Sequence, residues 1–338
     1  MIASDGVQTA SMAEDSAWLM SGLEDDVRSR MFEVADRGDA FALATIVKAD
    51  GGPRPVGAQM VVTARESWGF LSGGCIEDDV ALNAREVIDD GQPRAIVYGT
   101  GSPLIDIRLP CGGSIEVIIE RVSPTDAALA DLRSLTSARR PAVWISDGLM
   151  RRCIALGHGD DTTHALIVRH YVPCQRLVVV GSDPFALAIA GLGQTVGWDV
   201  SILAPFGPQA HPPIGVSYDR RTLAEAMNDP APDRWTAVAV ATHDLEQDES
   251  ALIPALQSPA GYVGVLGSRR KLDQRLAGLR SAGLDQLAIA RLSAPIGLNI
   301  GASSPWEVAL SVVAEIVDAC RGDTHRVVAP SRKPHVAA

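Results

Sequence analysis

The sequence RLVVVGSDPFALAIAGLGQTVGWDVSIL, residues 176–203, decides the fold class of this chain. It predicts a buried strand at Leu177–Val180, a helix at Phe185–Val196 and a second buried strand at Val200–Leu203. The alternation continues with two further strands, Ala237–Ala241 and Tyr262–Leu266, and four further helices, Thr222–Met227, Glu246–Leu256, Lys271–Ala282 and Pro305–Val317. Strands rich in Val, Ile and Leu and separated by helices are typical of a parallel sheet covered on both faces. The second half is therefore predicted to be an α/β, Rossmann-like parallel-sheet domain.

The first half shows short β-type runs divided by Gly- and Pro-rich loops, which predicts a mixed α+β sheet domain with few helices. The predicted strands are Phe41–Val47, Met60–Thr63, Ser67–Leu71, Arg94–Tyr98, Ser114–Glu120, Ala142–Ser146, Arg152–Ala155 and Ala165–His170. Apolar residues at helical spacing predict helices at Ala17–Gly38, Ile76–Asp90 and Pro124–Leu135. With 338 residues, we expect a flexible leader (1–16), an N-terminal domain (17–170), a Rossmann-like domain (174–320) and a flexible tail (322–338).

Charge and cysteine content exclude several classes of protein. The chain has 30 Lys and Arg against 41 Asp and Glu, a net charge of −11, which argues against a long nucleic-acid footprint. Five scattered cysteines form no disulfide framework, so we expect reduced thiols. The N-terminus has no secretory signal pattern, and a long stretch without Asp, Glu, Lys or Arg, 200–218, contains four prolines. We therefore expect a cytoplasmic protein that neither crosses a membrane nor binds nucleic acid.

The stretch LSGGCIE, residues 71–77, is the most informative candidate site. Gly73 and Gly74 lead Cys75 into the first turn of the predicted helix, where free N–H groups and the helix dipole favour a thiolate. Such a thiolate suits nucleophilic, sulfur-transfer or metal-binding chemistry. The acidic residues that follow Cys75 oppose this effect, and the alternative is a small, inert cysteine buried in a glycine turn.

Two further loops of the first domain carry candidate residues. In PCGG, residues 110–113, Cys111 precedes Gly112 and Gly113 just before a predicted strand, and the thiol could face Cys75 across the sheet. Two thiols on convergent loops could hold a soft metal, although the spacing is not that of a zinc site. In GGPRPVG, residues 51–57, Arg54 stands between two prolines as a candidate anion ligand or, alternatively, as a solvated arginine on a turn.

In the second domain, the loops that follow predicted strands are candidate ligand sites. Gly181-Ser182-Asp183 departs from the dinucleotide-binding fingerprint because Asp183 replaces the glycine that lets pyrophosphate approach, so NAD binding is disfavoured. His243 and Asp244 follow the strand Ala237–Ala241, and His243 could be a base, a metal ligand or a loop residue. The segment GSRRK combines a glycine turn with three cations at a helix start, which indicates a phosphate site; the alternative is a solvated basic first turn. Its residues are Gly267, Ser268, Arg269, Arg270 and Lys271.

Six motifs, taken in order along the chain, resemble the XdhC/CoxI family of xanthine dehydrogenase accessory factors. They are PRPVGAQM (53–60), SGGCIE (72–77), PCGG (110–113), THD (242–244), GSRRK (267–271) and APIGLNIGA (294–302). The resemblance covers about residues 17–318. The chain departs from relatives at Gly181-Ser182-Asp183-Pro184, where they usually show G-A-G-H, and at Asn299, where an aspartate is expected.

The resemblance implies a chaperone of the molybdenum cofactor, an accessory factor rather than an enzyme. Members of the family are understood to bind the cofactor transiently, as molybdopterin or its cytosine dinucleotide form, and to assist its sulfuration by a cysteine desulfurase. They deliver it to a xanthine dehydrogenase-type molybdenum hydroxylase. Carried over to this chain, the resemblance makes Cys75 and Cys111 molybdenum contacts and implies a homodimer.

Two other functions remain open from the sequence. An NAD(P)-dependent oxidoreductase would use the Rossmann-like half, with His243 or Cys75 as a catalytic group. A module that docks onto a molybdenum enzyme without touching cofactor would leave both glycine–cysteine loops unexplained. Replacing Cys75 or Cys111 by Ala distinguishes cofactor transfer from simple docking.

Overall fold

The computed structural model describes residues 20–52, 54–102, 109, 112–157, 162–226 and 231–321, with the backbone alone at Met20, Ser21, Arg269 and Arg321. The chain divides into two compact units, Met1–Pro173 and Cys174–Ala338. The leader expected over 1–16 and the tail expected over 322–338 lie outside the described residues.

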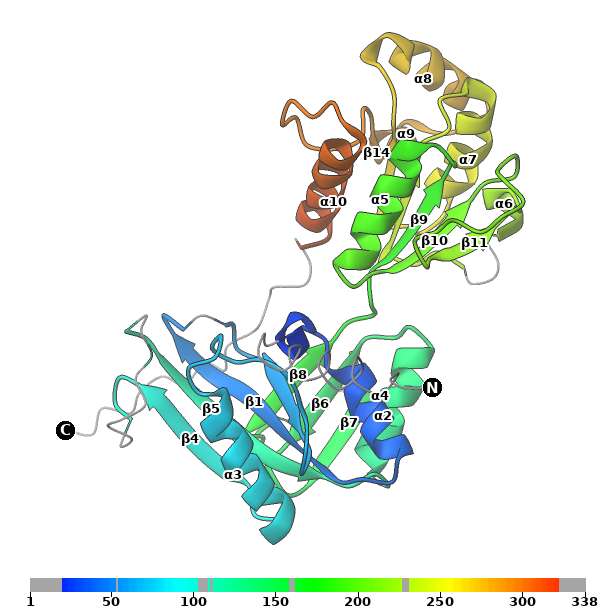
Figure 1. Ribbon diagram of the computed structural model, residues 1–338. Helices are drawn as coiled ribbons and strands as arrows, with labels where there is room; N and C mark the ends of the chain where they lie inside the picture. Colours follow the sequence, from blue (N-terminus) through cyan, green and yellow to red (C-terminus); the bar gives the residue numbers. More distant parts are fainter. Residues whose placement is uncertain are drawn as a thin grey trace, which may run out of the picture. The chain divides into compact units, whose positions relative to one another are not determined.

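The first unit is built on a five-stranded antiparallel sheet with the order β3-β2-β1-β5-β4 (Figure 1). Its strands are β1 (Phe41–Asp50), β2 (Gln59–Val62), β3 (Ser67–Gly69), β4 (Arg94–Gly99) and β5 (Ser114–Val122). A separate antiparallel sheet, β7-β6-β8, comprises β6 (Ala142–Ser146), β7 (Arg151–Ala155) and β8 (Ile167–Tyr171). The helices are η1 (Met20–Leu23), α2 (Arg28–Asp36), α3 (Glu77–Asp90) and α4 (Ala127–Ser137).

The alternation of apolar side chains along β1 explains the layers of this unit. Ala42, Ala44 and Ile46 face a core completed by α3, whereas Phe41 and Leu43 face a second core with α2, α4 and the three-stranded sheet. Successive side chains of a strand point to opposite faces, so a strand buried on both faces reads as a continuous apolar run. The sheet is thus the middle layer of the unit.

The single helix predicted over Ala17–Gly38 is wrong within the described residues. The chain forms the short η1 helix and begins α2 only at Arg28. The Asp26 carboxylate accepts hydrogen bonds from the backbone N–H (3.1 Å) and the Nε (2.9 Å) of Arg28. A local side-chain bond of this kind competes with helical hydrogen bonding and explains why the helix starts after Asp26.

The second unit is built on a six-stranded parallel sheet with the order β11-β10-β9-β12-β13-β14. Its strands are β9 (Arg176–Val180), β10 (Asp199–Leu203), β11 (Ser217–Asp219), β12 (Thr236–Val240), β13 (Tyr262–Val265) and β14 (Leu292–Ser293). Its helices are α5 (Pro184–Thr195), α6 (Leu223–Ala226), α7 (Leu245–Gln257), η2 (Arg269–Lys271), α8 (Leu272–Ser281), α9 (Gln286–Ala290) and α10 (Pro305–Arg321).

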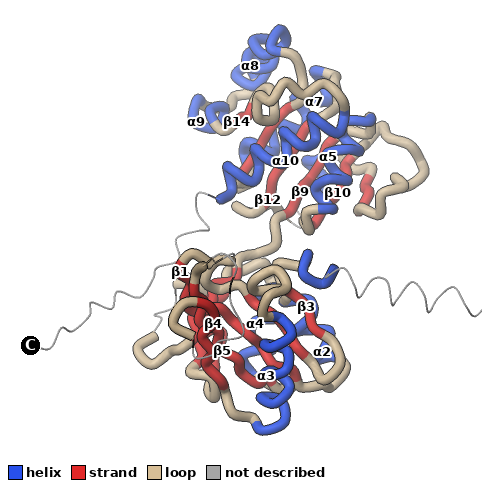
Figure 2. Tube along the Cα trace, turned by 60° about the vertical axis from the view of Figure 1, so that its left-hand side comes forward, coloured by secondary structure: helices blue, strands red, loops and turns tan. Residues whose placement is uncertain are grey.

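Helices cover both faces of the parallel sheet. Helices α5 and α10 lie side by side over one face, and α6, α7, α8 and α9 contribute to the core on the other (Figure 2). The predicted fold class, a mixed sheet domain followed by a Rossmann-like parallel-sheet domain, is confirmed. Sequence periodicity missed β11, α9 and β14 because two to five residues are too few to show a period.

Candidate functional site

One end of the five-stranded sheet gathers three of the motif loops. Asp50 of β1 pairs with Ser114 of β5, and Ser114 also pairs with Gly99, the last residue of β4. On the other flank of β1, and toward the same end of the sheet, Met60 of β2 pairs with Gly69, the last residue of β3. The loops that carry PRPVG, SGGC and PCGG therefore all leave or enter the sheet at this end.

Glu77, the first residue of α3, organises the loop that carries Cys75. Its carboxylate accepts bonds of 2.7–3.2 Å from five backbone N–H groups, those of Leu71, Ser72, Gly73, Gly74 and Ile76. Gly73 and Gly74 reach this loop conformation with φ of 94° and 106°, a region that favours glycine. Burial raises the pKa of Glu77, but the bonds from the Ser72 and Leu71 N–H groups outweigh it and lower the pKa to about 2.

The structure changes the interpretation of Cys75 in two ways. The residue lies before α3, not in its first turn, and the N–H groups expected to face its thiol bind Glu77 instead. Its own backbone N–H donates to the Ser72 hydroxyl at 3.1 Å. Cys75 is nevertheless exposed, so the alternative of a buried, inert cysteine is wrong. The Cys75 residue is therefore exposed, while hydrogen bonds to Glu77 hold the backbone of its loop.

The second glycine–cysteine loop is described only in part. Cys111, which carries the proposed thiol, lies outside the described residues. Gly112 and Gly113 fasten this loop to the end of β4: the backbone N–H of Thr100 donates to the Gly113 carbonyl at 3.1 Å, and the Thr100 hydroxyl donates to the Gly112 carbonyl at 3.2 Å. The convergence of Cys75 and Cys111 stays a prediction.

Arg54 is not a solvated arginine on a turn. Its guanidinium lies 4.5 Å from the centre of the Phe70 ring and forms an ion pair with Asp25. Its side chain is 21% exposed, and burial, followed by the charge of Arg169, lowers its pKa. Because Phe70 directly precedes the loop held by Glu77, the contact joins two of the motif loops.

In the second unit, the order of the strands reverses between β9 and β12, and ligands of parallel α/β sheets bind beyond the strand ends at such a point. Asp183 follows β9, accepts from the N–H of Ala186 at 2.8 Å as the N-cap of α5, and lies 2.6 Å from His243 Nε2 through its other oxygen. His243 follows β12 with φ of 61°, a rare conformation for a non-glycine residue. A hydrogen bond thus joins the two loops at the switch point.

Asp244 has a structural role at the same edge. Its carboxylate caps α7 by accepting from the N–H of Gln247 at 2.9 Å. The hydroxyl of Thr242 donates to Asp248 at 2.6 Å, and Asp248 forms a buried ion pair with Arg275 at 2.6 Å. These bonds fix the loop after β12 and leave His243 exposed.

The GSRRK segment follows β13 at this edge but differs from the prediction. Its cations were expected in the first turn of a helix starting at Lys271, and they form instead a 3-10 turn that precedes α8. Lys271 N–H donates to the Ser268 carbonyl at 3.0 Å, and Arg270 and Lys271 are exposed. Gly267 connects the strand to this turn, and Arg269 is described by its backbone alone.

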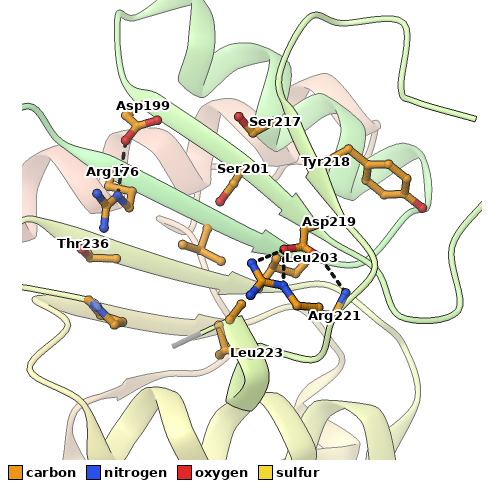
Figure 3. Close-up of a pocket in the computed structure, with 13 residues that line it drawn as sticks. Arg176, Asp199, Ser201, Leu203, Ser217, Tyr218, Asp219, Arg221, Leu223 and Thr236 are labelled. Atoms are coloured by element: carbon orange, nitrogen blue, oxygen red, sulfur yellow. Dashed lines mark hydrogen bonds and ion pairs between the residues drawn. The ribbon is translucent and has the colours of Figure 1, made fainter. Parts of the chain in front are cut away.

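A cavity of about 290 Å³ lies elsewhere on the second unit (Figure 3). Side chains from β9, β10, β11 and β12 line it, and its charged groups pair with one another: Arg176 with Asp199 at 3.3 Å and Arg221 with Asp219 at 2.6 Å. None of the predicted site residues lines it. Across the described residues, no cluster of three His, Cys, Asp or Glu could hold a metal ion. No helix in that part of the chain is long and apolar enough to span a membrane.

Sequence reasoning missed two groups that shape these sites. Glu77 was considered only as a charge that opposes a thiolate, although its carboxylate accepts hydrogen bonds from the glycine N–H groups of the loop. The partnership of Asp183 with His243 joins residues 60 positions apart and has no sequence signal.

Comparisons with known proteins agree with this architecture. The XdhC and CoxI family matches residues 34–99, and the XdhC Rossmann domain matches residues 177–316. The molybdenum cofactor insertion chaperone PaoD of Escherichia coli (strain K12) is 33% identical over 301 residues, which cover 87% of this chain and 89% of that protein. A protein of Bacillus subtilis (strain 168) named as a probable xanthine dehydrogenase component is 27% identical over 317 residues, covering 81% of this chain and 92% of that protein.

A solved structure shows the same fold. The crystal structure of a xanthine dehydrogenase from Bacillus halodurans superposes with a TM-score of 0.68 at 22% identity, covering 88% of this chain and 96% of that one. The matched domains lie in both units, and the similarity to PaoD extends over most of both chains. The chain therefore belongs to the XdhC and CoxI family.

Proposed function

We propose that this protein is a chaperone that binds the molybdenum cofactor as cargo, protects it and inserts it into a xanthine dehydrogenase-type molybdenum hydroxylase. The observation that carries the proposal is the exposed thiol of Cys75 on a fixed loop at the sheet end where three motif loops gather. The similarity to a molybdenum cofactor insertion chaperone supports it.

The residues of the loop cluster suit such a cargo. Thiolates are soft ligands that favour metals with sulfur in their coordination sphere. Cys75 supplies one thiol, and Cys111 supplies the second if its loop folds toward Cys75. Glu77 holds the Cys75 loop in one conformation through five backbone N–H groups, so the thiol is positioned before the cargo arrives.

The second unit carries its own candidate ligand site at the ends of its strands. The loops after β12 and β13 lie at the edge where α/β proteins bind ligands, and Gly267–Lys271 adds cations there. His243 and these cations would contact the nucleotide extension of the dinucleotide form, whereas Asp244 acts by capping α7. The cargo is molybdopterin or its cytosine dinucleotide form.

Partners follow from the same role. We infer that the chaperone holds the cofactor while a cysteine desulfurase supplies sulfur to it, and that the apoenzyme of a molybdenum hydroxylase receives it. We also propose a homodimer, which light scattering on the purified protein tests directly. A mass of about 71 kDa, twice the 35.6 kDa of the chain, is expected, and a monomeric mass contradicts it.

Binding of anaerobically prepared molybdenum cofactor tests the proposal. Wild-type protein should bind the cofactor stoichiometrically, and Cys75→Ala and Cys111→Ala should weaken binding. Cys174→Ala is the matched control, because Cys174 is also exposed but begins the second unit and is not part of the loop cluster. Full binding by both cysteine variants would exclude thiol contacts to the cargo.

The same samples test the alternative, an NAD(P)-dependent oxidoreductase. The Asp183 carboxylate occupies the N-terminus of α5, where pyrophosphate would bind, and pairs with His243. We therefore expect no heat of NAD binding in calorimetry. Tight NAD binding with no retained molybdenum would replace the chaperone proposal with the oxidoreductase.

A further inference from the structure

Two arginines of the first unit have unsatisfied buried nitrogens. Among the described residues, Arg54 Nε and Arg169 Nε are the buried side-chain nitrogen or oxygen atoms that have no hydrogen-bond partner. A buried donor without a partner costs about 1–3 kcal/mol, so two such donors are an unusual pair. Arg54 and Arg169 lie far apart in the sequence, but their charges interact: the charge of Arg169 contributes to lowering the pKa of Arg54.

Arg169 points into the unit rather than away from it. It lies on β8 between Ile167 and Tyr171, which are both buried, while Val168 and His170 on the opposite face are exposed. Its guanidinium lies 5.4 Å from the centre of the Tyr171 ring. The Tyr171 hydroxyl donates to the Gln59 side-chain carbonyl oxygen at 2.8 Å, which ties β8 to β2 of the five-stranded sheet.

The loop that carries Arg54 is shaped to accommodate Arg169. Gly57 has φ of 89°, and a Cβ at this position would lie 3.1 Å from Arg169 Nη1 and 3.2 Å from its Cδ. A side chain at position 57 would therefore be strained and would press on the guanidinium. The loop that presents Arg54 before β2 thus rests directly on Arg169.

The charges around the two arginines do not balance. Asp26 binds Arg28, whose Nε lies 2.9 Å from the carboxylate. Burial raises the pKa of Asp26, but the bonds with Arg28 and, less strongly, the charge of Arg169 lower it overall. Asp25 pairs with Arg54, but its side chain is 75% exposed, and an ion pair of that kind contributes little. The cluster therefore holds three arginines against two aspartates, and Arg169 forms no ion pair of 4.0 Å or less within the described part of the chain.

We propose that Arg54 and Arg169 together bind a phosphate monoester dianion. A guanidinium offers Nε–H and Nη–H as a planar fork that matches the oxygens of phosphate, and two forks would neutralise two negative charges. The rings of Phe70 and Tyr171 hold the two guanidinium groups in place, at 4.5 Å and 5.4 Å. If the proposed function holds and the cargo is molybdopterin, the monoester is its terminal phosphate, and the identification rests on that function.

Arginine Nε–H resonances in ¹⁵N-resolved NMR spectra of the full chain, titrated with inorganic phosphate, test the site. Two Nε–H resonances should shift saturably, one of them lost in Arg54→Lys and the other in Arg169→Lys. Lysine keeps the charge but removes the fork, so each variant should bind phosphate at least about tenfold more weakly. Arg121→Lys is the matched control, since Arg121 is an exposed arginine on β5, and its binding should equal that of the wild type.

Unsaturable shifts, or saturable binding that both lysine variants retain in full, would overturn the arginine pair as a phosphate site. Cofactor binding separates this failure from that of the proposed function. Cofactor retained through Cys75 with no phosphate effect at either arginine refutes the pair alone. Phosphate bound by the pair, in a protein that retains no cofactor, supports the pair and refutes the chaperone. Inorganic phosphate bound as tightly as a phosphate-bearing cofactor identifies free phosphate as the ligand.

Discussion

The Tyr98 hydroxyl donates a hydrogen bond to the Asp79 carboxylate at 2.6 Å, joining the end of β4 to the first turn of α3. Tyr98 is fully buried and lies at the edge of the sheet opposite β3, from which the Cys75 loop departs. The bond therefore fixes the first turn of α3, and with it the end of the Cys75 loop, beside β4.

Replacing Tyr98 by Phe should lower the free energy of unfolding by about 1–3 kcal/mol. The bond to Asp79 is lost while the ring packing is kept. Burial and the Asp79 bond raise the pKa of Tyr98, so the hydroxyl remains a donor at any working pH. Urea denaturation measures the change. Tyr218→Phe is the control, since its hydroxyl bonds an exposed carbonyl, and an equal loss in both variants would contradict the special role of Tyr98.

The Glu77→Gln variant should be less stable than the wild type near neutral pH, by roughly 3 kcal/mol, the free energy that corresponds to lowering its pKa from 4.5 to about 2. Because the folded-state pKa is lowered, this stabilisation is complete above pH 4.5 and is lost as the pH falls toward 2. Urea denaturation at several pH values should therefore show the two proteins converging in acid.

The exposed Glu66 provides a control for that comparison, because Glu66→Gln breaks only a surface ion pair of 3.5 Å with Arg37. Its stability should follow the wild type across the pH range. A constant difference between Glu77→Gln and the wild type down to about pH 2 would show that the carboxylate charge does not hold the loop.

Asp183→Gly should make the second unit bind pyrophosphate or NAD. The change removes the carboxylate that caps α5 and frees its N-terminal N–H groups beside a glycine turn. Loss of the cap should cost about 1 kcal/mol of stability. Calorimetry measures the binding, and Asp285→Gly, which removes the cap of α9 away from the switch point, is the control. If Asp183→Gly binds neither ligand, the carboxylate is not what blocks the turn.

Alkylation should distinguish exposed cysteines from buried ones. Cys75 and Cys174 are exposed, whereas burial, with a smaller effect from Asp131, raises the pKa of Cys153 to about 12. Iodoacetamide on the folded protein at neutral pH should modify Cys75 and Cys174 and spare Cys153. Peptide mass spectrometry locates the label, and urea should then expose Cys153. Early labelling of Cys153 would contradict its burial.

Local sequence was enough to predict most of the fold. The apolar runs Leu177–Val180 and Ala237–Ala241 with helices between them predicted the parallel sheet. Such features depend on periodicity and on backbone preferences within a few residues. The apolar spacing predicted a continuous helix through residues 20–27, but α2 begins only at Arg28. The Asp26 carboxylate binds the backbone N–H of Arg28 and so competes with helical hydrogen bonding.

The candidate site likewise has features that were visible in the sequence and features that were not. The glycine–cysteine motif and the arginine between prolines were visible in the sequence, and the family resemblance followed from such motifs in order. Only the tertiary structure decided that Glu77 takes the N–H groups near Cys75, that Asp183 pairs with His243 and that Arg169 lies against the loop of Arg54. These relationships depend on strand register and on how separate elements pack, which no local pattern encodes.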